Sequence, residues 1–354
     1  MSSIFFKKQF FEGDLEFPKY LFPCLMCCSG VIQILWLTFI SNHKDEWTVL
    51  IVLFLQLWIA ICVFRSRTTI RLLTEDLYRI SNMLHVYTIQ KKKMLKIFVW
   101  VYCVFVTTVT VFLAVTIFNS GMVAQEQQKL RNSEIVAARL KEHTVAILNG
   151  SFIFPLLVGN FFSGILPGYY CFACCCMKEI FLHFVWKSKV LIARQDYPRI
   201  IEIYKEMNET MIMMDDFLSL PILVSVVNIM ASLFWYGYSF AFPPNGNNVT
   251  GIFVSIGFLQ YFVLLLITLT PAAAVNQAAA MARELVLSLP GWIPNRYSII
   301  KALICRSFMG KTSLTLWKIY RIDNSLLISA IGTLISYGIL IGTLGSVQSS
   351  NNEN

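Results

Sequence analysis

Residues 318–344 read KIYRIDNSLLISAIGTLISYGILIGTL and tell more about this chain than any other stretch. Its beginning contains the charged residues Lys318, Arg321 and Asp323, whereas residues 324–344 carry no charge. About 20 apolar residues are enough for a helix to cross the hydrocarbon core of a bilayer. The stretch therefore predicts a transmembrane helix that has a charged flank at its start and lies close to the C-terminal end of the sequence.

Six further charge-free runs precede this helix, in a chain of 354 residues of which 56% are hydrophobic and 14% charged. Soluble domains carry about 25% charged residues, and a charge at the centre of an inserted helix costs about 2.5–3.5 kcal/mol. The composition therefore excludes an ordinary soluble fold and predicts an all-α, polytopic membrane protein. Its seven transmembrane helices are expected at residues 21–41, 47–64, 97–119, 144–170, 217–241, 251–272 and 325–344.

The basic residues predict the orientation of these helices. With the N-terminus inside, 24 of the 29 Lys and Arg residues face the cytoplasm, as the positive-inside rule requires. The net charge of +9 therefore reflects membrane topology and indicates no nucleic-acid partner. We expect one transmembrane domain over residues 1–354, with the C-terminus outside. Its parts are a cytoplasmic N-terminus (1–20), cytoplasmic loops (65–96, 178–216 and 273–324) and an extracellular tail (345–354).

Apolar residues recur at helical spacing in the predicted cytoplasmic loops. The sixth span is expected to continue as a helix past Pro271 until Pro290-Gly291, and a second helix is expected over about 296–318, before the last span. The last helix is thus predicted to be split into a cytoplasmic and a spanning part, above a compact helical base. The two apolar stripes are Leu73, Leu77, Ile80 and Leu84, and Ile200, Tyr204, Met207, Met211 and Met214.

Cysteines and glycosylation sequons fit this topology. Cys171 and Cys174–Cys176 lie at the inner end of the fourth span. They are expected to pack as small residues at a helix end, with palmitoylation as the alternative. Asn149 and Asn248 begin sequons on the predicted outer side and are candidate glycan acceptors, whereas the sequon at Asn208 is predicted to be cytoplasmic. No spacing of His and Cys residues predicts a metal site.

No arrangement of residues predicts an enzyme or a cofactor site. The predicted spans contain no ionisable Asp, Glu, Lys or Arg, which disfavours an ion-coupled transporter. Their polar and aromatic residues allow two interpretations, namely interhelical hydrogen bonds worth about 0.6 kcal/mol each or an apolar pocket with a few polar anchors. For a small-molecule pocket, the candidates are Asn160, a polar residue within the fourth span, and four aromatic residues in the outer halves of the spans, namely Phe112, Phe152, Trp235 and Tyr261.

The last span also carries a resemblance. Residues 320–337 read YRIDNSLLISAIGTLISY, with Leu326-Leu327, Ser329 and Gly332-Thr333 in order. This resembles the final helix of arthropod gustatory receptors. In that family the same residues are followed by Thr-Tyr, five apolar residues and Gln-Phe. Here Ser336 replaces the Thr and Thr343-Leu344 replaces the Gln-Phe. The chain therefore resembles a divergent member of the insect-type chemoreceptor superfamily, and the Tyr-Ser-Tyr ending of the related odorant receptors fits less well.

The resemblance implies a tetrameric, ligand-gated, non-selective cation channel that detects small-molecule tastants. It also implies a place in the plasma membrane of sensory dendrites, as a homotetramer or a heterotetramer with related receptors. Each subunit would contribute its last helix to a central pore, with Tyr337, Leu340, Thr343 and Leu344 as candidate pore and gate residues. A metabotropic seven-span receptor is the alternative function, against which the predicted orientation argues.

Overall fold

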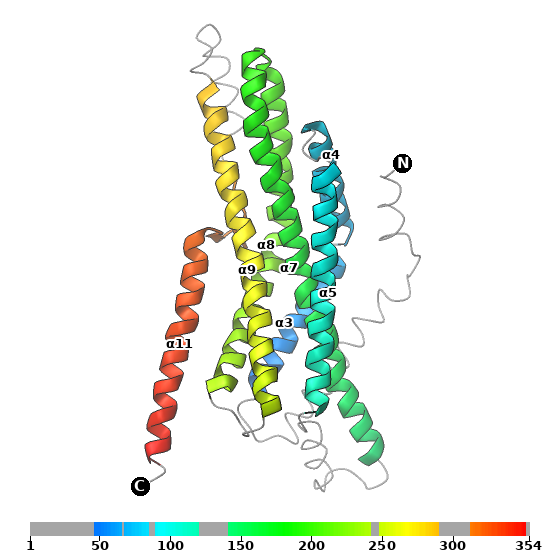
Figure 1. Ribbon diagram of the computed structural model, residues 1–354, viewed down its shortest axis with the longest axis vertical. Helices are drawn as coiled ribbons and strands as arrows, with labels where there is room; N and C mark the ends of the chain where they lie inside the picture. Colours follow the sequence, from blue (N-terminus) through cyan, green and yellow to red (C-terminus); the bar gives the residue numbers. More distant parts are fainter. Residues whose placement is uncertain are drawn as a thin grey trace.

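A computed structural model describes residues 46–65, 67–84, 89–119, 141–241, 248–289 and 312–351. The first expected span, at 21–41, lies outside these residues. Within them the fold is helical, as predicted, with a single two-stranded hairpin (Figure 1). The elements are α3 (Glu46–Arg65), α4 (Arg67–Leu84), α5 (Ile89–Asn119), α7 (Lys141–Ala193), α8 (Tyr197–Ala241), α9 (Asn248–Ser288), β1 (Thr315–Leu316), β2 (Tyr320–Arg321) and α11 (Asn324–Asn351).

Helices α7, α8 and α9 lie side by side at the centre of the molecule (Figure 1). With 53 residues, α7 is about 80 Å long, whereas the hydrocarbon core of a bilayer is about 30 Å thick. A tight turn at residues 194–196 joins α7 to α8. Gln195 adopts a left-handed φ of 61° there, and the N–H of Asp196 donates to the Leu191 carbonyl at 3.0 Å, a pattern that ends helices.

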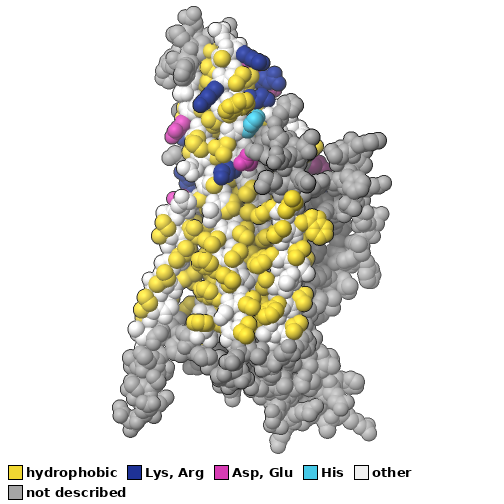
Figure 2. Space-filling view, viewed as in Figure 1, with side chains coloured by type: hydrophobic (Ala, Val, Ile, Leu, Met, Phe, Trp, Pro, Cys, Tyr) yellow, Lys and Arg dark blue, Asp and Glu magenta, His cyan; other side chains and the backbone are white. Residues whose placement is uncertain are grey.

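Three of the described helices are long and apolar enough to cross a membrane, by length and composition. Hydrophobic side chains cover the middle of the molecule, whereas charged ones gather around the end where α7 and α8 meet (Figure 2). This end is called the charged end below. The long apolar stretches are Ser163–Ala193, Tyr197–Phe240 and Gly251–Ser288, and shorter ones are Phe54–Val63, Ile97–Leu113 and Asn324–Leu340.

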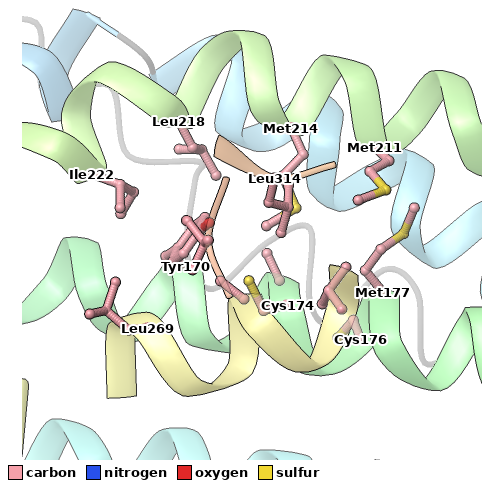
Figure 3. Close-up of a cluster of buried hydrophobic side chains, with 14 of the residues drawn as sticks. Tyr170, Cys174, Cys176, Met177, Met211, Met214, Leu218, Ile222, Leu269 and Leu314 are labelled. Atoms are coloured by element: carbon pink, nitrogen blue, oxygen red, sulfur yellow. The ribbon is translucent and has the colours of Figure 1, made fainter. Parts of the chain in front are cut away.

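The two predicted apolar stripes are confirmed as buried helix faces. All nine residues of the two stripes, on α4 and α8, are buried. They belong to the same core as Met177 and Phe181 of α7, and Figure 3 shows part of this core. Cys174 and Cys176 are buried in it as well, which favours packing over palmitoylation at these two positions.

Helix α9 continues past Pro271 to Ser288, as expected. Proline removes one backbone N–H and so leaves a carbonyl one turn earlier without its helical donor. Small residues follow on the buried face of α9, namely Ala272, Val275, Ala278, Ala279 and Ala282. They allow α7 and α8 to approach closely along this length.

The prediction of a helix up to residue 318 is wrong at its end. Residues 312–318 are extended and then turn, and β1 pairs antiparallel with β2 in the register Thr315↔Arg321 and Leu316↔Tyr320. Trp317 and Lys318 adopt left-handed φ values of 50° and 58°. Contacts with distant parts of the chain hold this conformation, and such contacts override local helix propensity. Residues 296–311 of the expected helix lie outside the described part.

Candidate functional site

Four helices bring polar side chains together around the hydroxyl of Tyr261 in α9. This hydroxyl donates to Oδ1 of Asn160 in α7 at 2.7 Å. The side chains of Ser232 in α8 and Gln56 in α3 also approach it. All four residues are buried. With the neighbouring Tyr236, they are called the Tyr261 cluster below.

Two oxygen atoms on side chains near the Tyr261 hydroxyl form no hydrogen bond of regular geometry with any described residue. They are Oε1 of Gln56 and Oγ of Ser232, and Oε1 of Gln260, next to Tyr261 in the chain, is in the same state. An unpaired buried polar atom costs about 1–3 kcal/mol, and each such atom in a native protein calls for an explanation. The cluster therefore has hydrogen-bonding capacity that the described chain does not use.

Aromatic rings form one wall of the cluster. The ring centroid of Tyr236 lies 5.7 Å from that of Tyr261 and 4.8 Å from that of Trp235. Gly257 of α9 makes room for the Tyr236 ring, because a Cβ atom at this position would lie 2.2 Å from a ring carbon. Polar anchors beside an aromatic wall are the usual composition of a small-molecule site.

The structure brings together part of the predicted pocket. Asn160 and Tyr261 are in direct contact, and Trp235 joins them through Tyr236. Phe112 lies on α5 with 40% of its surface exposed, and the described residues show no ring contact between it and the cluster. The side chain of Phe152 lies outside the described part.

The predicted pocket residues do not include Gln56, Ser232 and Tyr236. Gln56 is recognisable in the sequence as a candidate, since it is a polar residue in the middle of an apolar run. Ser232 is not recognisable in this way, because serine is common in membrane helices and its hydroxyl often forms a hydrogen bond within its own helix. No group of His, Cys, Asp or Glu residues in the described part could hold a metal ion.

Helix α11 stands at the edge of the bundle (Figure 1). The predicted pore residues Tyr337 and Leu340 are 53% and 52% exposed, and Thr343 is exposed as well. The side chain of Leu344 lies outside the described part. The helix contacts α8 and α9, including an edge-to-face contact between the rings of Tyr337 and Phe234 at 6.4 Å. So much apolar surface needs lipid or a further chain to cover it.

Asp323 caps the start of α11. Its Oδ1 accepts hydrogen bonds from the Ser325 hydroxyl at 2.7 Å and the Leu326 N–H at 3.0 Å. These bonds favour the charged carboxylate and lower the pKa of Asp323 below its ordinary value. A carboxylate at this position also complements the positive end of the helix dipole. The polar flank seen in the sequence is therefore a helix cap.

The three sequons lie on helices. Asn149 lies within α7 and Asn248 is the first residue of α9, and the side chains of both lie outside the described part. Asn208, near the charged end of α8, accepts a hydrogen bond from the Thr312 hydroxyl. Its amide is therefore engaged within the chain.

Comparison with known proteins gives a match in fold only. No family model and no curated protein matches the sequence. Among solved structures, the chain resembles the insect olfactory receptor OR5 from Machilis hrabei. The TM-score is 0.57 at 11% identity, over 91% of this chain and 87% of the receptor.

The same receptor in complex with eugenol gives a TM-score of 0.62 at 13% identity, over 92% of this chain and 88% of the receptor. Identities this low show a shared fold and do not by themselves show a shared function. The chain therefore has the fold of an insect olfactory receptor. Its resemblance to gustatory receptors in particular stays a prediction.

Proposed function

We propose that this protein is a chemoreceptor of the insect type, in which a small molecule opens a cation channel formed by several copies of the chain. The observation that carries this proposal is the Tyr261 cluster, a buried meeting point of four helices with unused hydrogen-bonding capacity. The fold supports it, because OR5 has been solved with the small aromatic molecule eugenol bound. The last-helix motif favours a tastant as the ligand.

The site would bind its ligand by partial separation of the helices. The unpaired oxygens of Gln56 and Ser232 are fully buried, so a ligand reaches them only when α3 or α8 shifts. A ligand stabilises the arrangement of helices that it binds more tightly. Binding at the cluster therefore favours an arrangement in which α3, α8 and α9 are displaced relative to one another, and α8 contacts α11 through Phe234, two residues before Tyr236.

The pore would form where four copies of α11 meet. Leu340, Thr343 and Leu344 are spaced i, i+3 and i+4, so they share one helix face and would line the narrowest point, with Tyr337 packing behind them against Phe234 of α8. A ring of leucine side chains closes a narrow pore by excluding water. In this assembly the exposed apolar surface of α11 faces its counterparts. The tetramer can consist of identical subunits or of related receptors.

The proposed topology keeps the N-terminus and the loops 65–96, 178–216 and 273–324 in the cytoplasm and the tail 345–354 outside, in the plasma membrane. An epitope placed after Asn354 should then be labelled on intact cells. Glycan should be lost in Asn248→Gln and retained in Asn208→Gln. Labelling of the epitope only after permeabilisation would refute this topology.

Current recording tests the function directly. Cells that express the chain, alone or with a related receptor, are exposed to a panel of small aromatic and sugar ligands. We expect a cation current in excised patches, and cysteines placed at 340, 343 and 344 should react with a permeant thiol reagent during ligand application. Responses that need G proteins and disappear in excised patches would instead support a metabotropic receptor.

A further inference from the structure

One amide side chain of α9 binds both ends of the hairpin before α11. Asn276 of α9 is 3% exposed. Its Nδ2 donates to the carbonyls of Leu314 at 3.0 Å and of Ile322 at 2.7 Å, and its Oδ1 accepts from the N–H of Leu314 at 2.7 Å. One asparagine therefore binds the backbone at both ends of the hairpin, with both of its donors and its acceptor in use.

Apolar contacts support this attachment. Leu314 and Ile322 are almost completely buried, and their backbones are joined by a bond from the Ile322 N–H to the Leu314 carbonyl at 3.1 Å. Figure 3 shows Leu314 among Met214 and Leu218 of α8. The base of the hairpin is therefore part of the core that α7, α8 and α9 share.

Helix α8 holds the same hairpin from a second side. Oδ1 of Asp215 accepts from the Thr315 N–H at 2.6 Å and from the Thr315 hydroxyl at 2.9 Å. Asp216 forms an ion pair with Lys318 at 2.6 Å, and the N–H of Trp317 donates to the Ser219 carbonyl at 3.3 Å. Asp216 and Lys318 are largely exposed, so their ion pair contributes little, and the attachment depends mainly on the bonds of Asn276 and Asp215.

Very little chain separates this attachment from the pore helix. Asp323, the residue after Ile322, is the cap of α11. One residue spans at most about 3.6 Å, so the first turn of α11 must follow any displacement of the segment bound by Asn276. Tyr261 precedes Asn276 on the same helix by about 22 Å along the axis. The ligand cluster and the hairpin attachment are therefore on one continuous element.

We infer that Asn276 is a positioning residue that transmits movement of α9 to the pore helix, by fixing the hairpin rigidly to α9. The inference rests on the proposed function and adds to it a specific residue outside both the pocket and the pore. The chemistry requires asparagine, because aspartate lacks the two donors and leucine lacks the donors and the acceptor.

The test compares Asn276→Asp and Asn276→Leu with the parent chain. Asn228→Leu is the matched control, since Asn228 is equally buried but binds Ser163 of α7 and not the hairpin. Three quantities are measured at matched surface abundance: ligand binding, ligand-evoked current, and the thiol reactivity of a cysteine introduced at the buried position Leu316. If Asn276→Leu fails to reach the surface, Asn276→Asp, which keeps the size of the side chain and its acceptor, carries the test.

We expect the ligand-evoked current of the Asn276 variants to change by about tenfold, within the usual range for coupling between two sites. Ligand binding should stay close to that of the parent and the control, and the cysteine at 316 should become reactive. Unchanged gating in the variants, with or without this reactivity, would overturn the inference. If the parent chain binds ligand but carries no current, the proposed channel is wrong. In that case the cysteine at 316 still tests the attachment, because a cysteine that stays unreactive in the Asn276 variants would show that Asn276 does not hold the hairpin.

Discussion

Replacing Tyr261 by phenylalanine removes one oxygen atom from the Tyr261 cluster and keeps the ring. The bond from this hydroxyl to Oδ1 of Asn160, at 2.7 Å, is then lost. In soluble proteins an unpaired buried acceptor costs about 1–3 kcal/mol, whereas bonds between membrane helices average about 0.6 and reach about 1.7 kcal/mol. Because the pair lies in the apolar part of the molecule, we expect Tyr261→Phe to lower the free energy of unfolding by about 0.6–1.7 kcal/mol.

The assay is a double-mutant cycle with Asn160→Leu, measured as unfolding of the purified protein in detergent. The two substitutions together should cost less than the sum of their separate effects, because they remove the same bond. Thr268→Val on α9 is the control, since the Thr268 hydroxyl donates only to the Leu264 carbonyl of its own helix, at 2.7 Å. Such bonds add little stability. A coupling energy below about 0.3 kcal/mol, within the error of additivity, would refute the bond.

Three further predictions follow from other parts of the structure. Gly257→Ala should destabilise the protein by about 1–3 kcal/mol because it displaces the Tyr236 ring, whereas Gly251→Ala on the same helix meets open space and should not, as thermal unfolding can show. The lowered pKa of Asp323 means that its contribution to stability is present above the ordinary pKa and is lost as pH falls through the lowered value; Asp323→Asn should keep the cap and remove this acid sensitivity of the unfolding temperature. Leu344→Ser should admit water to the constriction and raise the basal cation current, whereas a serine at position 327, near the start of α11, should leave the basal current unchanged.

The helices of the charged end could be predicted because burial follows helical spacing in the sequence. Leu73, Leu77, Ile80 and Leu84 share one face of α4, and that face is buried. The hairpin could not be predicted. Asn276, which holds it, lies 38 and 46 residues from its two partners in the chain. The turn also places Trp317 and Lys318, and no glycine, at positive φ, so no turn signal appears in the sequence.

The contacts within the candidate site could not be predicted from the sequence either. Asn160 and Tyr261 were each selected as a polar residue in an apolar span, and they prove to be partners. Their contact depends on how α7 and α9 are aligned along their axes, and helical spacing within one segment carries no information on that alignment. Ser232 could be assigned only after this alignment was known.

The length of α7, α8 and α9 limits how the protein can be divided into fragments. Each of these helices is continuous from the apolar band to the charged end, so in the proposed topology the boundary between lipid and water crosses all three within their length. A protease that cuts exposed loops therefore cannot detach the water-facing part. A shorter fragment of the chain cannot form that part alone either. Its core is built from α4, α7, α8, α9 and the hairpin, and the chain between these elements includes the apolar stretches. It can be obtained only together with the membrane-embedded part.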